Sequence, residues 1–189
     1  MTPDDVLVLF RRAGALLDGL FRLSSGLHST GYLQCALVLR HPEHAAARGA
    51  PLAAAARHLA PAVVLSPALG GVIVGHEVAR ALGVRAIFAE RQDAALTLRR
   101  GFTLSPADRV LVAEDVVTTG KSTRETIEVA RAAGATPVGA VAIIDRGGAG
   151  DLGVPAFTLA TASFPTYDPA GCPLCARGVP VVKPGSRPV

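Results

Sequence analysis

The sequence predicts an α/β fold in which helices flank a central, mostly parallel sheet. Short apolar runs, typical of buried strands, alternate with longer segments whose apolar residues recur at helical spacing. Half of the 189 residues are hydrophobic, yet 4% are aromatic and none is Trp, so Ala, Val, Leu and Ile must build the core. This composition favours layered packing over a small β-sandwich. No repeat or linker divides the chain, and its length suits one domain.

The first part of the chain is expected to begin with a helix from Pro3 to about Leu17. Its acidic residues come early and its basic residues later, which is the order that the helix dipole favours. Ser24–Gly26 interrupts the pattern, and the apolar stretch Tyr32–Leu39 is expected to be a strand. An Ala-rich helix follows at Pro42–Leu59, since proline is acceptable in a first turn.

The second part of the chain repeats one theme, an apolar strand followed by a helix. The run Ala62–Leu65 is bounded by prolines and predicts a buried strand. This alternation indicates βαβ units and a parallel sheet, whose ligands bind beyond the carboxyl ends of the strands. Further elements are expected at Val72–Leu82 (helix), Val84–Ala89 (strand), Val110–Ala113 (strand), Ser122–Ala133 (helix) and Pro137–Ile144 (strand).

Charge and cysteine content narrow the classes of protein. The net charge is +4, and all basic residues except Lys121 and Lys183 are Arg, which binds phosphate through a bidentate fork. These charges are dispersed without interleaved aromatics, so small phosphorylated ligands explain them as well as nucleic acid does. Three cysteines, an acidic start unlike a signal peptide, and no uncharged apolar span of about 18 residues predict a soluble, cytoplasmic protein.

The segment with the strongest functional signal runs from Val110 to Thr123. An apolar strand ends there in two adjacent carboxylates, Glu114 and Asp115, and a loop with hydroxyls and Gly120 opens a helix. Successive N–H groups of such a loop and the helix N-terminus form an anion site. The hydroxyls of Thr118, Thr119, Ser122 and Thr123 are expected to add donors. A nucleotide-binding P-loop is excluded because the glycine that it requires five positions before Gly120 is Asp115.

The adjacent acids indicate what else is bound. Two carboxylates would repel a second phosphate, but they suit sugar hydroxyls or a hydrated Mg²⁺ ion. A ligand with a phosphate at one end and a ribose diol nearby satisfies both halves of the segment. The simpler alternative is a Ser/Thr helix cap preceded by surface acids.

The segment Glu114–Thr123 resembles the signature of type I phosphoribosyltransferases that binds phosphoribosyl pyrophosphate (PRPP). The resemblance implies that the acids hold the ribose hydroxyls, that the loop amides hold the 5′-phosphate, and that Mg²⁺ is bound mainly through PRPP and not directly by the protein. The family more often has Gly where Lys121 stands. The PRPP-binding residues implied here are Glu114, Asp115, Val116, Val117, Thr118, Thr119, Gly120, Lys121 and Ser122.

Other segments resemble the orotate phosphoribosyltransferases over nearly the whole length. Phe21–Ser29 resembles their N-terminal segment, which implies orotate contacts at Ser25 and Gly26. Ser66–Gly71 resembles their pyrophosphate loop. That likeness implies further PRPP contacts at Ala68, Leu69 and Gly70.

The same resemblance implies how orotate is held and how the chain is organised. Arg146 is expected to bind the orotate carboxylate, and Thr118 also to touch orotate. The whole chain, 1–189, is expected to be one phosphoribosyltransferase domain, with a core at about 41–160 and a small hood from about 1–40 and 160–189. The likeness further implies a homodimer with shared active sites.

The polar segment between Arg91 and Leu104 is expected to be a mobile loop or a small hairpin. Many orotate enzymes have a loop here with several Lys and a His, and this chain has neither between Glu90 and Ala95. Arg91 fits the first basic position of that loop and is expected to bind PRPP and to be catalytic, together with Glu114 and Asp115. Arg99 and Arg100 either replace the other charges or belong to a solvated basic hairpin.

The tail after Pro165 is rich in Pro and Gly and is expected to wrap the surface. It contains Cys172-x-x-Cys175, a spacing that by chemistry alone suggests zinc or redox work. Only one such pair is present, so packing or a local disulfide are the alternatives.

The sequence therefore predicts an enzyme that transfers the phosphoribosyl group of PRPP to orotate, giving orotidine 5′-phosphate and pyrophosphate for pyrimidine synthesis. Two alternatives stay open at this point. One is the same fold acting on a purine base, and the other is a PRPP-sensing transcription regulator, which would add a DNA-binding segment or a basic face.

Overall fold

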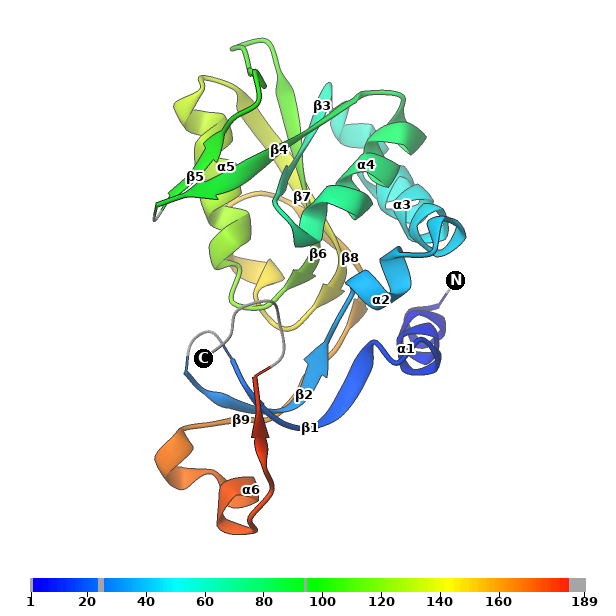
Figure 1. The fold of residues 1–189 in the computed structure, drawn as a ribbon. Helices are drawn as coiled ribbons and strands as arrows, with labels where there is room; N and C mark the ends of the chain where they lie inside the picture. The colour runs from blue at the N-terminus through cyan, green and yellow to red at the C-terminus, as the bar shows by residue number, and fades with distance from the viewer. Residues whose placement is uncertain (1, 24–25, 94, 184–189) are drawn as a thin grey trace.

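The computed structural model of the chain describes residues 2–23, 26–93 and 95–183, and it confirms the α/β class with a mostly parallel central sheet (Figure 1). Within these residues the larger sheet has six strands, in the order β5-β4-β3-β6-β7-β8. Only the β4–β5 pair is antiparallel. The strands are β3 (Val63–Pro67), β4 (Arg85–Gln92), β5 (Ala95–Leu98), β6 (Arg109–Val117), β7 (Thr136–Asp145) and β8 (Ala156–Thr161).

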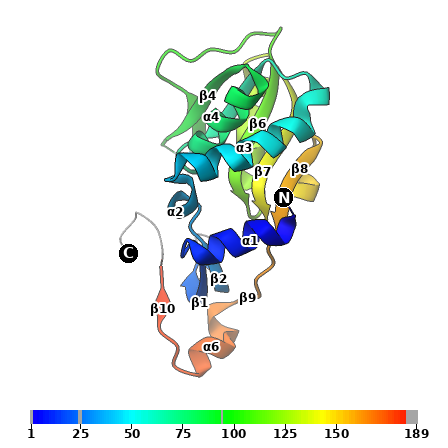
Figure 2. The same ribbon diagram turned by 90° about the vertical axis from the view of Figure 1, so that its right-hand side faces the viewer.

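Helices cover both faces of the larger sheet. One face packs on α5 (Lys121–Ala132), and the other packs on α1 (Pro3–Arg12), α3 (Pro42–Ala56) and α4 (Gly70–Leu82) (Figures 1 and 2). Neighbouring residues of one strand belong to different cores, since Val64 packs with α3 and α4 whereas Val63 and Leu65 pack with α5. Side chains alternate along a strand, so a strand buried on both faces has the continuous apolar run seen in the sequence.

A smaller sheet lies beyond the carboxyl edge of the larger one (Figure 1). Its order is β10-β1-β2-β9, in which β1 and β2 form an antiparallel pair and β10 runs parallel to β1. The chain after Pro165 therefore does more than wrap the surface, because it supplies two of these strands and the short helix α6 (Pro173–Ala176). The strands are β1 (Leu16–Arg22), β2 (His28–Leu33), β9 (Thr166–Tyr167) and β10 (Val181–Val182).

The predicted strand at Tyr32–Leu39 is wrong in its second half. The strand β2 ends at Leu33, and a short helix, α2 (Ala36–Leu39), follows it. The Leu39 N–H donates to the Cys35 carbonyl at 2.9 Å, which closes one helical turn. Both Val38 and Leu39 are buried, and a short apolar run does not by itself distinguish a buried turn of helix from a strand.

The first predicted helix is too long. It ends at Arg12, and Gly14 turns the chain with a φ of 64° before β1 begins at Leu16. The region of Arg91–Leu104 contains a hairpin, β4–β5, in which Arg91 pairs with Leu96. The other predicted elements agree with the structure to within four residues at their ends; the largest difference is at β6, which continues to Val117 beyond the predicted end at Ala113. Across the described ranges, no helix is long and apolar enough to cross a membrane.

Candidate active site

Two adjacent carboxylates, Glu114 and Asp115, lie near the end of β6 and face different helices. The Ser122 hydroxyl of α5 donates to Glu114 Oε2 at 3.1 Å. The Asp115 carboxylate lies against the start of α4, where a Cβ added to Gly70 would come within 2.8 Å of Asp115 Oδ1. Successive strand residues point to opposite faces, so one acid belongs to each side of the sheet. The pair therefore lies between the N-terminal ends of two helices.

Burial dominates the electrostatics of this pair. It raises the pKa of Glu114 well above the ordinary value, and the neighbouring Asp115 raises that pKa further. Burial also raises the pKa of Asp115, against the hydrogen bond that its Oδ1 accepts from the Val116 N–H at 2.8 Å. The ion pairs of the described residues include neither carboxylate. Hydroxyl donors or a hydrated cation would therefore satisfy these two groups.

Two residues that the sequence did not single out lie close to the acids. Burial, followed by the charges of Asp115 and Glu114, raises the pKa of the Cys35 thiol well above its usual value. Burial and Asp115 likewise raise the pKa of Tyr32. Tyr32 lies in β2 and Cys35 directly precedes α2, so both are far from β6 in the sequence and local spacing did not indicate them. The local sequence pattern around Tyr32 and Cys35 gave no signal that these residues lie beside the acid pair.

The loop between β6 and α5 is braced from behind. Gly120 has a φ of 74°, and a Cβ there would come within 2.9 Å of the Gly148 carbonyl oxygen. Arg124 donates to the carbonyls of Thr119 and Asp151, both at 2.9 Å. These contacts hold the backbone of the loop in one curve with Gly120 at the start of the helix. Such a turn presents N–H groups to an anion.

The hydroxyls of the loop do not all face outward as expected. Thr118 and Thr119 are exposed. The Ser122 hydroxyl instead donates to Glu114, and the Thr123 side chain is buried with no hydrogen-bond partner among the described residues. The expectation that Thr123 adds a donor to the phosphate site is therefore wrong. The helical turn points its side chain into the core behind the loop.

A second turn, between β3 and α4, lies next to the acid pair. It contains a cis peptide bond between Ala68 and Leu69, and the Leu69 side chain is 86% exposed. The Ala68 N–H donates to the Ala89 carbonyl at 2.8 Å, so this amide is used within the sheet. Gly71 packs closely on the Ala113 carbonyl. An anion at this turn would therefore meet the amides at the start of α4 and not that of Ala68.

Arg146 lies at the end of β7 and joins the two sheets. Its N–H donates to the Val117 carbonyl at 2.8 Å, which places it beside the end of β6. The guanidinium donates from Nη2 to Ser29 Oγ at 3.2 Å and stacks 4.7 Å from the centre of the Phe164 ring. Its buried Nε has no hydrogen-bond partner in the described part of the chain. Burial lowers the pKa of Arg146, and Tyr32 opposes that shift.

This environment suits a planar anion. The guanidinium is held by stacking and by one hydroxyl, and it still has donors to offer. A carboxylate can accept two parallel hydrogen bonds from such a group. Among the predicted orotate contacts, Ser25 lies outside the described residues, whereas Gly26 forms the turn before β2 with a φ of 88°.

Arg91 lies on the β4–β5 hairpin, and its guanidinium pairs with Glu125 on α5. The structure thus places Arg91 beside the outer face of α5 and not against Glu114 or Asp115. Arg100 donates to both oxygens of Glu90 at 2.7 and 2.8 Å. Its charge is therefore used within the hairpin, which favours the interpretation of a solvated hairpin over a replacement for loop lysines.

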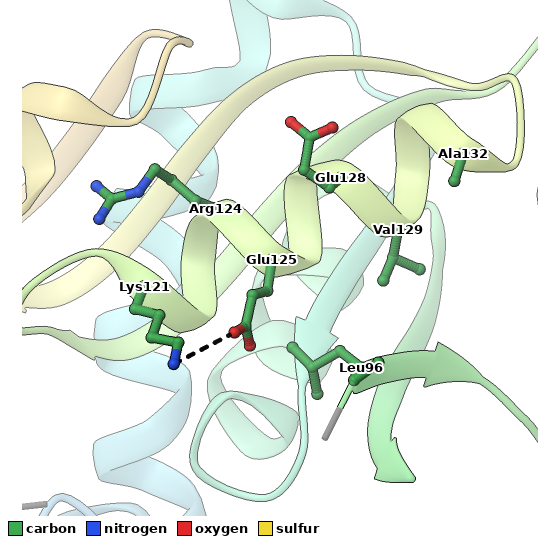
Figure 3. A pocket seen from close by; sticks show the side chains of 8 residues that line it. Leu96, Lys121, Arg124, Glu125, Glu128, Val129 and Ala132 are labelled. Carbon is green, nitrogen blue, oxygen red and sulfur yellow. Dashed lines mark ion pairs between the residues drawn. The ribbon is translucent and has the colours of Figure 1, made fainter. Parts of the chain in front are cut away.

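A cavity of about 530 Å³ lies between β5 and α5 (Figure 3). It is lined by Leu96 and by the outward side chains of α5, including Glu125 and Val129. Lys121 also lines it, with its Nζ 3.9 Å from Glu125 Oε1. The Lys121 side chain is therefore directed toward Glu125. Glu114 and Asp115 do not line this cavity, so it is a feature separate from the acid pair.

Comparison with known proteins decides the family. An orotate phosphoribosyltransferase of Pelotomaculum thermopropionicum is 52% identical over 190 residues and covers all of both chains. The chain belongs to the orotate phosphoribosyltransferase family. The family enzyme of Heliobacterium modesticaldum is 50% identical, with 99% of this chain and all of the relative covered. No protein-family model matches the chain.

Solved structures agree with this assignment. The orotate phosphoribosyltransferase of Aeropyrum pernix has a TM-score of 0.70 and 27% identity, covering 82% of this chain and 93% of that one. An adenine phosphoribosyltransferase of Thermoanaerobacter pseudethanolicus has a TM-score of 0.61 at 15% identity, covering 70% and 88%, and shares the fold. The predicted family, its type I phosphoribosyltransferase fold and the enzyme class are thereby confirmed.

Proposed function

We propose that this edge of the sheet transfers the phosphoribosyl group of PRPP to orotate, giving orotidine 5′-phosphate and pyrophosphate. One observation carries the proposal. The ends of the neighbouring strands β6 and β7, paired at Val117 and Asp145, bring the acid pair and the phosphate loop next to Arg146. A diol acceptor, an anion site and a carboxylate clamp thus lie on two adjacent strand ends.

PRPP would be held by three groups on the larger sheet. Glu114 and Asp115 take part in none of the ion pairs described above, so their oxygens are available. In the proposal they accept hydrogen bonds from the ribose hydroxyls. The amides of the 118–121 loop bind the 5′-phosphate at the start of α5. The turn at Leu69–Gly70 directs the start of α4 toward the pyrophosphate, adjacent to Asp115.

A Mg²⁺ ion fits this donor set. The acid pair offers hard oxygen acceptors, and the ion would be held mainly by PRPP oxygens and water, with Glu114 and Asp115 accepting hydrogen bonds from the ribose hydroxyls and from that water. The ion supplies neutralisation of the negative charge that collects on the pyrophosphate.

The reaction is a displacement at ribose C1. The bond from C1 to the pyrophosphate oxygen breaks, an orotate ring nitrogen forms a bond to C1 from the opposite face, and the proton of that nitrogen is released to solvent. The protein aligns the reactants: Arg146 orients orotate through its carboxylate, with Thr118 and Gly26 nearby, while the acids fix the ribose. Backbone amides at the start of α4 stabilise the departing charge. This chemistry requires no covalent nucleophile.

Two further features of the protein, its oligomeric state and its compartment, belong to the proposal. The hairpin that carries Arg91 packs on α5 and not on its own acid pair, which supports a homodimer in which each hairpin serves the neighbouring active site. The three free cysteines, two of them buried, support a reducing compartment, the cytoplasm.

The direct test is to follow orotate absorbance with purified protein, PRPP and Mg²⁺, and to add EDTA as a control. We expect loss of orotate that requires both PRPP and the metal. Adenine, guanine and xanthine serve as competing acceptors, because they lack a carboxylate for Arg146. Turnover of a purine in place of orotate would contradict the proposal. PRPP binding without turnover of any base would instead indicate a sensor.

A further inference from the structure

The smaller sheet contains a cluster of soft metal ligands that the transferase reaction does not use. The ligand atoms of His28, Cys172 and Cys175 all lie within 4.8 Å of one another. The Cys175 sulfur is 3.3 Å from His28 Nδ1. His28 is 6% exposed and Cys172 is 4% exposed. In the ranges that the structure describes, this is the only group of three or more such side chains with metal-binding geometry.

The chain builds this cluster from two distant segments. His28 begins β2 and pairs with Tyr167 of β9. A short turn then runs from Asp168, whose carboxylate accepts the Ala170 N–H at 2.9 Å, into α6. The Ala176 N–H donates to the Cys172 carbonyl at 3.1 Å, so one helical turn separates the two cysteines. Residues three apart on such a turn lie on one side, which brings both sulfurs to the imidazole.

We propose that His28, Cys172 and Cys175 bind one Zn²⁺ ion, with water as its fourth ligand. Thiolate and imidazole are the ligands that zinc prefers, whereas Mg²⁺ requires oxygen ligands. The site is therefore chemically distinct from the acid pair and does not compete for the same ion. Binding releases a proton from each thiol, because the thiolate is the ligand. The sequence alone offered one Cys pair, and His28 is the third ligand that only the fold supplies.

The position of the cluster gives the ion a structural role. It would connect residues that are 147 positions apart along the chain, Cys175 and His28. A cross-link over such a long loop restricts the unfolded chain strongly. It would also hold the start of β2, and the next residue, Ser29, accepts the hydrogen bond from Arg146. The ion thus anchors the C-terminal segment to the strand that supports the orotate clamp.

A disulfide between Cys172 and Cys175 is the competing interpretation. All three cysteines are free thiols in the structure. A disulfide would also leave the buried imidazole of His28 beside it without a function. Zinc binding accounts for all three side chains at once.

The test begins with the full-length protein, purified without a metal-affinity tag and with reductant. After removal of metal by a chelator, the protein is titrated with Zn²⁺, and bound zinc is measured by mass spectrometry of the metal. Co²⁺ replaces Zn²⁺ in a parallel titration because thiolate-bound Co²⁺ absorbs visibly and reports tetrahedral geometry. We expect one ion per chain and a thiolate-to-cobalt absorption band.

The variants Cys172→Ser, Cys175→Ser and His28→Gln should each lose stoichiometric zinc and the cobalt band. Matched controls are Cys35→Ala, which removes the remaining thiol, and His76→Gln, whose side chain is 69% exposed on α4. Both controls should retain one zinc ion. If a ligand variant does not fold, chelation of the wild type replaces it and should lower the unfolding midpoint by about 5 °C or more, reversibly on adding Zn²⁺.

Three results would overturn the proposal. The first is wild-type protein with reduced thiols that takes up no stoichiometric zinc. The second is zinc content that the three ligand variants leave unchanged. The third is a Cys172–Cys175 disulfide that persists at a reductant concentration sufficient to reduce ordinary protein disulfides.

Discussion

The proposed active site has two halves, one for PRPP and one for orotate, and they are built in different ways. The PRPP half comes from two turns, at Leu69–Gly70 and Thr118–Gly120, each joining a strand to the helix that follows it. The orotate half combines Arg146 of the larger sheet with Ser29 of the smaller one. One half therefore depends on local chain geometry, and the other depends on contacts between distant segments.

Because of this difference, the two halves should respond differently to substitution. A βα turn is held by its own strand and helix, so a change there alters the site without disturbing the smaller sheet. Arg146 relies on Ser29 and Phe164, which come from opposite ends of the chain. Kinetic constants for PRPP and for orotate should therefore separate cleanly between the two groups of variants.

The largest effect is expected for Asp115→Asn. The substitution removes a charged acceptor, and charge-assisted hydrogen bonds contribute about 1.5–3 kcal/mol each, so kcat/KM for PRPP should fall by about 100-fold. Steady-state kinetics of orotate consumption measure this loss. The matched control is Asp151→Asn, whose side chain is 99% exposed, and circular dichroism checks the fold. Unchanged turnover and PRPP affinity in Asp115→Asn would remove the acid pair from the mechanism.

Arg146→Lys should act on the other substrate. Lysine cannot form the bidentate pair with a carboxylate, so KM for orotate should rise by about 10-fold or more while PRPP binding stays near the wild-type value. Titration calorimetry with each substrate separates the two affinities. Arg131→Lys, on the outer face of α5, serves as the control. An equal loss of PRPP affinity would show that the two halves are not independent.

Arg124→Ala should give a smaller loss on the PRPP side. The guanidinium braces the loop through two backbone carbonyls, and its removal loosens the loop without taking away an amide donor. We expect a rise of about threefold to tenfold in KM for PRPP, with KM for orotate little changed. A wild-type KM for PRPP in this variant would mean that Gly148 alone holds the loop.

Glu114 should make the stability of the ligand-free enzyme depend on pH. Its folded-state pKa lies above the unfolded value of 4.5, so the folded protein binds the proton more tightly. The contribution is therefore present at pH values below 4.5 and is lost as the pH rises from there through the raised pKa. Urea unfolding of the wild type and Glu114→Gln from pH 5 to 8 measures the difference. The prediction would be contradicted if the free energy of unfolding of the wild type, relative to that of the variant, increased as the pH rises.

The local half of the site was also the half that the sequence predicted. Strand, acid pair, loop and helix follow one another between Val110 and Ala133, so spacing alone located them. The two wrong predictions, for the segment Ala36–Leu39 and for Thr123, also have physical causes. The short run Ala36–Leu39 has no periodicity that separates helix from strand, and the hydroxyl of Thr123 is turned inward by the helical geometry.

The smaller sheet could not be predicted from local pattern. Its outer strands β9 and β10 each span two residues, too few to give a recognisable alternation. They form because β1 and β2 offer them unpaired edges. Arg146 was expected near the substrate, but its contacts with Ser29 and Phe164 were not predicted. Ser29 is 117 positions away along the chain, and a contact over such a separation leaves no mark on local spacing.

The parallel pairing of β10 with β1 also has a consequence for synthesis of the chain. All strands of the larger sheet precede residue 162, whereas β10 pairs with Leu20 and Phe21 through Val181 and Val182. A growing chain on the ribosome can therefore fold the PRPP half of the site first, since chains begin to fold from the N-terminal side. The smaller sheet, which holds Ser29 beside Arg146, is completed only when the last of these strands has been released. A nascent chain would thus acquire an affinity for PRPP before it acquires one for orotate.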